Sequence, residues 1–129
     1  MITAIHTLVY ADDPDAARAF FRDVLQWPHV DTGGGWLIFR TGPSELGVHP
    51  TSGEVHDGAA PWTTPEHHEI SLVCDDLTAT MEELRGRGAE FTREARDDGF
   101  GITTEIVVPG TSQALLLYQP RYDPPALAD

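Results

Sequence analysis

An internal repeat constrains the fold of this chain more than any other feature. Residues 6–13 read HTLVYADD and residues 69–76 read EISLVCDD, so an apolar, strand-like run closed by two aspartates occurs twice. A helix-like segment follows each run, and the ends of the halves also correspond, with ELGVHP at 45–50 and LLLYQP at 115–120. Such self-similarity predicts two similar half-domains, with a site between them at equivalent positions of each.

The length and the charge of the chain limit what it can be. A chain of 129 residues suits one domain with a buried core, so the two repeats are units of one fold. The net charge of −13 disfavours nucleic acid as a partner, and it either attracts cationic small molecules or keeps the protein soluble.

No apolar run reaches membrane-spanning length and the N-terminus lacks the regions of a signal peptide, so we expect a soluble, cytoplasmic protein without a membrane partner. The single cysteine, Cys74, excludes an internal disulfide and is expected to be a buried, inert thiol.

Each half reads as a strand, a helix and three further strands, which makes the predicted fold α+β. Asp12 or Asp13 is expected to cap the first helix, with Pro14 at its first position. Residue periodicity predicts helices over 14–26 and 77–88 and strands over 1–10, 28–32, 36–40, 46–49, 68–74, 90–95, 102–108 and 114–119. The expected organisation is a single domain over 1–120, with unit one at about 1–50, a linker or flap over 51–66, unit two at about 67–120, and a loose C-terminal tail over 121–129.

The paired units resemble the vicinal oxygen chelate (VOC) superfamily, the group of glyoxalases, bleomycin-resistance proteins and extradiol dioxygenases. The resemblance covers residues 1 to about 120 and rests on the repeat, on His6 in the first strand, on FFRDVL at 20–25 and on LYQP at 117–120. It implies two tandem βαβββ units whose sheets form an incomplete β-barrel around a central cavity. It also implies a homodimer, with the units either closing on each other within one chain or exchanging between partners.

Metal enzymes of this superfamily usually take their ligands from the first and last strands of each unit. The resemblance places those positions at His6, Leu46, Glu69 and Leu116. A leucine has no lone pair, and two donors are too few for a catalytic divalent site, so we predict no metal cofactor. A shift of one residue would instead turn His68 inward and restore a metal site with His6, so the ligands of any bound metal are expected among His6, Glu69 and His68.

The alternation of side chains along strands gives a check on the cavity lining that does not depend on the resemblance. If His6 and Glu69 point inward, their neighbours on the same strand faces do so as well. The predicted ligand-contacting residues from the strands are Leu8, Tyr10, Leu46, Val48, Ser71, Leu116 and Tyr118. A mostly apolar and aromatic lining with few polar groups is typical of a pocket for an organic ligand.

Two tryptophans are further candidates for contact with a ligand. Trp36 follows three glycines, which would let a flat ligand stack close to the backbone, although a place in the core explains this residue equally well. Trp62 lies in a linker otherwise poor in apolar residues, where it would close over the cavity or pack at a dimer seam.

A His6–Glu69 pair would act as a structural brace, as a ligand anchor or as an acid/base couple. Three functions of the protein are consistent with these roles. The leading hypothesis is a binding protein of the bleomycin-resistance type that sequesters an aromatic or cationic compound in an apolar cavity without metal. The alternatives are a metal-dependent lyase, isomerase or dioxygenase that uses His6 and Glu69, and a metal-free enzyme in which the same pair transfers protons. The identity of the ligand does not follow from the sequence.

Overall fold

Unit two builds the main sheet of the molecule. The computed structural model describes residues 6–53 and 61–123. Its largest sheet has the strand order β5-β8-β7-β6, in which β5 is parallel to β8 and the other neighbours are antiparallel. These strands are β5 (Ser71–Val73), β6 (Arg96–Asp97), β7 (Gly101–Val107) and β8 (Ala114–Pro120). The strand predicted over 90–95 is wrong in extent, because only Phe91 forms a bridge, to Ile106, and β6 begins at residue 96.

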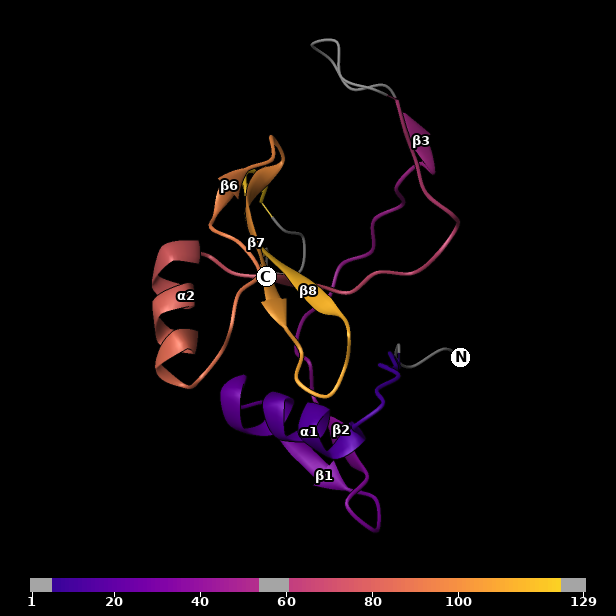
Figure 1. Ribbon diagram of the computed structural model, residues 1–129, viewed down its shortest axis with the longest axis vertical. Coiled ribbons are helices and arrows are strands. Elements are labelled where there is room, and N and C mark those ends of the chain that lie inside the picture. Colours follow the sequence, from indigo (N-terminus) through magenta and orange to yellow (C-terminus); the bar gives the residue numbers. More distant parts are fainter. Residues whose placement is uncertain (1–5, 54–60, 124–129) are drawn as a thin grey trace.

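One face of this sheet is covered by the helix α2 (Leu77–Gly86) (Figure 1). The side chain of Asp76 caps the helix by accepting a hydrogen bond from the amide of Ala79 at 3.0 Å. Leu77, Met81 and Leu84 are buried, as expected when residues at three-to-four spacing lie on one face of a helix. They pack in one core with the alternate sheet residues Ile106, Leu115 and Leu117. Each fully buried aliphatic side chain in this layer stabilises the fold by about 2 kcal/mol relative to exposure.

The helix of unit one begins and ends at residues that suit a helix terminus. In α1 (Pro14–Ala19), Pro14 occupies the first turn and the Asp13 carboxylate accepts a first-turn amide at 3.1 Å, which confirms the predicted cap. The helix continues as one π-helical turn, η1 (Phe20–Val24). Gln26 then adopts a positive φ of 58°, a conformation that cannot continue a right-handed helix.

Unit one joins unit two through this helix. Ala17 and Phe20 enter the same buried core as α2 and the main sheet. The amide of Asp13 donates to the carbonyl of Gly110 in the β7–β8 turn at 2.9 Å. Arg87, at the end of α2, donates to the carbonyl of Val24 at 2.7 Å. The two units therefore share one core, and hydrogen bonds fix both ends of the helical segment.

The strands of unit one are shorter than predicted. A hairpin of β1 (His29–Asp31) and β2 (Leu37–Phe39) is present, but residues 6–10 and 46–49 form no strand. An alternating pattern becomes a strand only where a neighbouring strand accepts its backbone hydrogen bonds, and in the described residues neither segment has one. Residues 1–5 of the predicted first strand lie outside the described residues.

The predicted linker contains regular structure. Strands β3 (Ser52–Gly53) and β4 (Trp62–Thr63) pair antiparallel within the segment expected to be irregular, and β3 lies well away from the main sheet (Figure 1). The α+β class is confirmed, whereas the described part of the chain forms no closed barrel. Among residues 6–53 and 61–123, no helix is long and apolar enough to cross a bilayer.

Candidate functional site

The face of the main sheet opposite α2, here called the open face, carries the candidate site. Leu116 of β8 is paired with Ser71 of β5 on one side and with Glu105 of β7 on the other. Two residues further along, Tyr118 is flanked in the same way, so the two rows share a face. The open face thus carries Ser71, Val73, Thr103, Glu105, Leu116 and Tyr118. Three of the predicted ligand-contacting residues, Ser71, Leu116 and Tyr118, are brought together here.

The β5–β8 side of the open face is apolar and aromatic. Val73 is 40% exposed, Leu116 is half-buried, and Tyr118 is buried against its neighbours. The ring of Phe100 meets Tyr118 edge to face, with 5.4 Å between ring centroids, and Phe100 is itself 48% exposed. Phe100 was not predicted as a site residue, because it lies in a turn without periodicity.

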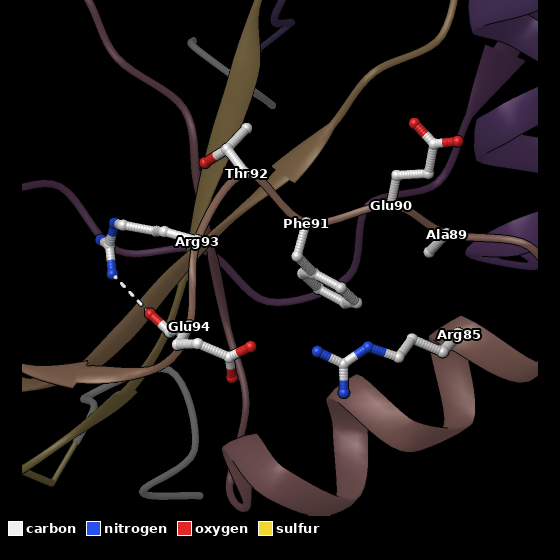
Figure 2. Close-up of a pocket in the computed structure, with 7 residues that line it drawn as sticks. All are labelled: Arg85, Ala89, Glu90, Phe91, Thr92, Arg93 and Glu94. Atoms are coloured by element: carbon white, nitrogen blue, oxygen red, sulfur yellow. Dashed lines mark hydrogen bonds between the residues drawn. The ribbon is translucent and has the colours of Figure 1, made fainter.

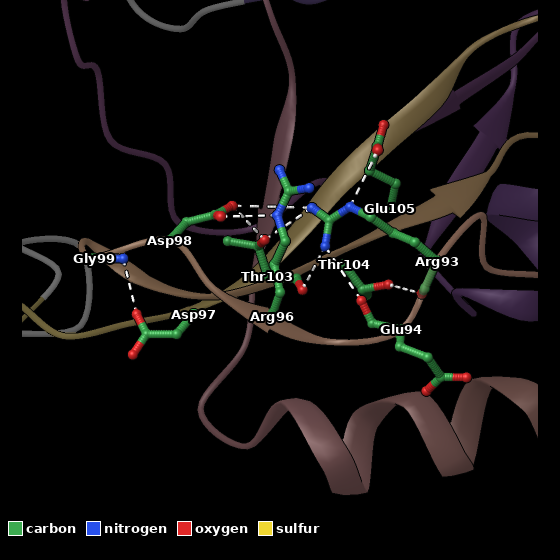
Figure 3. A network of polar contacts seen from close by, with 9 residues as sticks. All are labelled: Arg93, Glu94, Arg96, Asp97, Asp98, Gly99, Thr103, Thr104 and Glu105. Atoms are coloured by element: carbon green, nitrogen blue, oxygen red, sulfur yellow. Dashed lines mark hydrogen bonds and ion pairs between the residues drawn. The ribbon is translucent and has the colours of Figure 1, made fainter. Parts of the chain in front are cut away.

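The β6–β7 side of the open face is polar and internally satisfied (Figure 3). The Arg93 guanidinium donates to the Thr103 carbonyl at 2.9 Å, to the Thr103 hydroxyl at 2.8 Å and to Glu105 at 3.4 Å. The Thr103 hydroxyl in turn donates to Asp98 at 2.7 Å. This bond, more than the nearby Arg96 and Arg93, holds the pKa of Asp98 below its usual value. Since its donors bond within the protein, the network forms a rigid border rather than a set of reactive groups.

An ion pair closes the end of the sheet. The Arg121 guanidinium donates to both oxygens of Asp97, at 2.6 and 2.5 Å, which ties the residue after β8 to β6. This bidentate bond, with a further bond from the Gly99 amide, lowers the pKa of Asp97 to about 2. The first residue of the predicted loose tail is therefore held against the sheet.

A carboxylate from unit one reaches the aromatic end of the open face. The Tyr122 hydroxyl donates to Glu45 Oε1 at 2.5 Å, and the Tyr118 hydroxyl lies 3.4 Å from the same oxygen. The two hydroxyl oxygens are 2.6 Å apart. The hydrogen bond to Glu45 is the main reason that the pKa of Tyr122 is raised. Neither Glu45 nor Tyr122 was predicted, since contacts across more than 70 residues leave no local signal.

The predicted pair of His6 and Glu69 stays a prediction. Both residues are exposed, and Glu69 lies 3.5 Å from the Nε2 atom of His67. The pKa of His67 is raised, first by its bond to the Pro65 carbonyl and then by Glu69. His68 is also exposed.

Cys74, which was expected to be buried, is only partly buried and packs against the core. Its Sγ atom donates to the Tyr118 carbonyl at 3.5 Å, and partial burial raises the pKa of the thiol. A raised pKa keeps the sulfur protonated and weakly nucleophilic, in line with the predicted inert role.

Most of the other predicted contact residues lie at the surface. Four of them are more than half exposed, from 54% to 94%: Leu8, Tyr10, Leu46 and Val48. Trp36 is 55% exposed, so it is not a core residue. The guanidinium carbon of Arg18 lies over its ring, 4.9 Å from the ring centre. Trp62 is half-buried, and its ring packs over Gly53 of the paired strand β3. The centres of the Trp62 and His49 rings are 5.3 Å apart.

The residues at the four family positions do not fit a divalent metal. Leu46 and Leu116 offer no donor atom, while His6 and Glu69 are exposed. Within residues 6–53 and 61–123, no three His, Cys, Asp or Glu side chains lie close enough to hold an ion together.

A separate groove of about 550 Å³ runs between the end of α2 and residues 89–94 (Figure 2). The Arg85 guanidinium lies 5.1 Å from the centre of the Phe91 ring, and Glu94 points toward the same space. None of the predicted site residues lines it.

Comparison with known proteins identifies the family. The model of the Glyoxalase/Bleomycin resistance protein/Dioxygenase superfamily matches residues 3–108. The fold is similar to that of lactoylglutathione lyase from Agrobacterium tumefaciens, with 20% identity, a TM-score of 0.58, and 92% of this chain and 94% of that chain covered. It is also similar to an integron cassette protein from the mobile metagenome of V. Cholerae, with 16% identity, a TM-score of 0.51, and 92% and 98% covered. Curated proteins give no significant match. The chain therefore belongs to the Glyoxalase/Bleomycin resistance protein/Dioxygenase superfamily.

Proposed function

We propose that this protein binds a small aromatic or cationic organic molecule on the open face and sequesters it, in the manner of a resistance protein, without metal and without chemistry. The composition of the open face carries the proposal. Val73, Leu116 and Tyr118 supply apolar and aromatic surface, and a rigid polar network borders it. Organic ligands are typically bound by such a combination.

Two further observations support binding over catalysis. The leucines at positions 46 and 116 replace the side chains that a metal-dependent enzyme would need. In the described residues, the ion-pair partner of Glu69 is His67 rather than His6, which gives no support to a His6–Glu69 acid/base couple. The net charge of −13 attracts cations to the whole molecule.

The open face needs a cover to bury a ligand. Ligand pockets usually enclose most of the ligand surface, whereas one face of a sheet leaves the opposite side of the ligand in solvent. Tyr10, Leu46 and Val48 are apolar and 81% to 94% exposed, so they offer surface that a second copy would bury. We therefore propose a homodimer as the binding form.

The test is titration with Nile red, a neutral aromatic dye whose fluorescence rises in apolar surroundings. Leu116→Glu places a carboxylate in the middle of the open face, so the dissociation constant should rise about tenfold or more. Val30→Glu is the matched control, because Val30 is 62% exposed and lies on β1, which belongs to the separate β1–β2 sheet. This variant should change the dissociation constant less than twofold. Equal affinity in the Leu116→Glu variant and the unaltered protein would place the ligand elsewhere.

A further inference from the structure

The contact of Glu45 with two tyrosines carries one inference beyond general ligand binding. Glu45 belongs to a segment, residues 41–51, without strand pairing, yet its carboxylate meets both hydroxyls at the end of β8. Both recorded bonds reach Oε1, and no described donor reaches Oε2. A carboxylate oxygen with lone pairs to spare thus lies at the edge of the open face.

The charge of this cluster resides on Glu45. The pKa of Tyr122 is raised, chiefly by its hydrogen bond to Glu45, so the phenol stays protonated and acts as the donor. The basic side chains at this end of the main sheet are already engaged: Arg121 by Asp97, Arg96 by Asp98, and Arg93 by Glu105. The negative charge of Glu45 is therefore not balanced by any of these arginines.

Two tyrosine hydroxyls meet the carboxylate, and a third aromatic ring packs against one of these tyrosines. Tyr118 forms the floor, Phe100 meets it edge to face, and Tyr122 is joined to it through the hydroxyls. Phe100 is 48% exposed and Tyr122 is 43% exposed, so both retain ring surface that a ligand can cover. Ring faces attract cations, and a carboxylate beside them adds a directed partner.

We infer that Glu45, Phe100, Tyr118 and Tyr122 form a cation-recognition corner that accepts an ammonium or guanidinium group of the ligand. The inference rests on the proposed function and makes it narrower, because the open face would hold the apolar part of the same molecule. Glu45 and the negative net charge of the protein disfavour an anionic ligand at this corner.

The experiment compares two dyes on the full chain: thioflavin T, an aromatic cation, and Nile red, which is neutral. Glu45→Gln keeps the hydrogen-bond acceptor and removes the charge, so thioflavin T affinity should fall roughly tenfold while Nile red affinity changes less than twofold. Glu82→Gln is the control, since Glu82 is an equally charged, exposed residue on α2 and its loss should change neither affinity. Phe100→Leu keeps apolar bulk without a π face and should also weaken thioflavin T selectively.

The outcomes separate this inference from the proposed function. If Glu45→Gln weakens both dyes equally, Glu45 only fastens the segment 41–51 to the sheet, and the inference fails. It also fails if neither dye is affected. In both cases the proposed function stands as long as Leu116→Glu weakens Nile red binding about tenfold or more. If Leu116→Glu has no effect, the proposed function fails first.

Discussion

At the scale of single residues, the open face combines satisfied polar groups with exposed aromatic ones. Thr103 on the open face and Thr104 on the α2 face are fully buried, and each hydroxyl has a hydrogen-bond partner, Asp98 and the Arg93 carbonyl respectively. Leaving such a hydroxyl unpaired costs about 1–3 kcal/mol, so Arg93 and Asp98 stabilise the border of the site. The residues available for a ligand are those that this network does not use.

Arg121 is predicted to control the titration of Asp97. The pKa of Asp97 is lowered to about 2, so the ionised carboxylate favours the folded state. This contribution is complete above the unfolded value of 3.8 and is lost as the pH falls through about 2. NMR titration of the side-chain carboxyl should give a midpoint of about 2, and Arg121→Gln should move it toward the ordinary range. Asp98, whose lowered pKa depends mainly on Thr103, should be little affected and serves as the internal control. An unchanged Asp97 midpoint in the variant would contradict the assigned cause.

The sequence predicts some residues of the site and misses others for a physical reason. Ser71, Leu116 and Tyr118 could be predicted to share a face, because alternation along a paired strand fixes which side chains lie together. Glu45, Phe100 and Tyr122 were missed, because they lie in irregular segments and meet the site only through tertiary contacts. Such contacts leave no periodic pattern in the sequence from which they could be predicted.

At the scale of elements, helices were predicted more accurately than strands. The stripe of Leu77, Met81 and Leu84 and the cap at Asp13 depend on local spacing, so the sequence contains them. The strands of unit one depend on a partner strand, and alternation at 46–49 produced none. The two-residue strands β3 and β4 are too short to carry any pattern.

The contact of α1 with the β7–β8 turn gives a prediction for the joint between the units. Gly110 has a φ of +82°, and a Cβ atom there would lie 2.2 Å from the Asp13 carbonyl oxygen, which is backbone and cannot swing aside. Gly110→Ala should therefore lower the free energy of unfolding by about 2–4 kcal/mol, measured by urea denaturation. Gly99→Ala is the control, because Gly99 has a φ of +88° with nothing within 4 Å, so it should cost only about 1–2 kcal/mol of backbone strain. Equal losses in the two variants would mean that the joint does not depend on this close approach.

At the scale of the whole molecule, one shared core supports a sheet whose second face is only partly covered in the described residues, with Val73 40% exposed and Leu116 half-buried. The repeat predicted two units and a site between them, and the structure places the candidate site on unit two with a contribution from Glu45 of unit one. What the repeat could not determine is what covers the open face when a ligand is bound.

If a second copy of the chain covers the open face, the protein is a dimer in solution. Light scattering coupled to gel filtration should give about twice the chain mass of 14.1 kDa. Val48→Asp, at a residue 94% exposed in the single chain, should shift the population toward monomer because it places a charge in an apolar interface. A monomer mass for the unaltered protein at all concentrations would contradict the proposed assembly.

The most direct test of the central claim is amide NMR of the isotope-labelled protein during titration with thioflavin T. A ligand on the open face should produce saturable shift changes centred on Ser71, Val73, Leu116 and Tyr118, with Phe100 and Tyr122 at the edge of the affected region. Saturable changes centred instead on the groove at Arg85, Phe91 and Glu94, or no saturable change at all, would contradict the account.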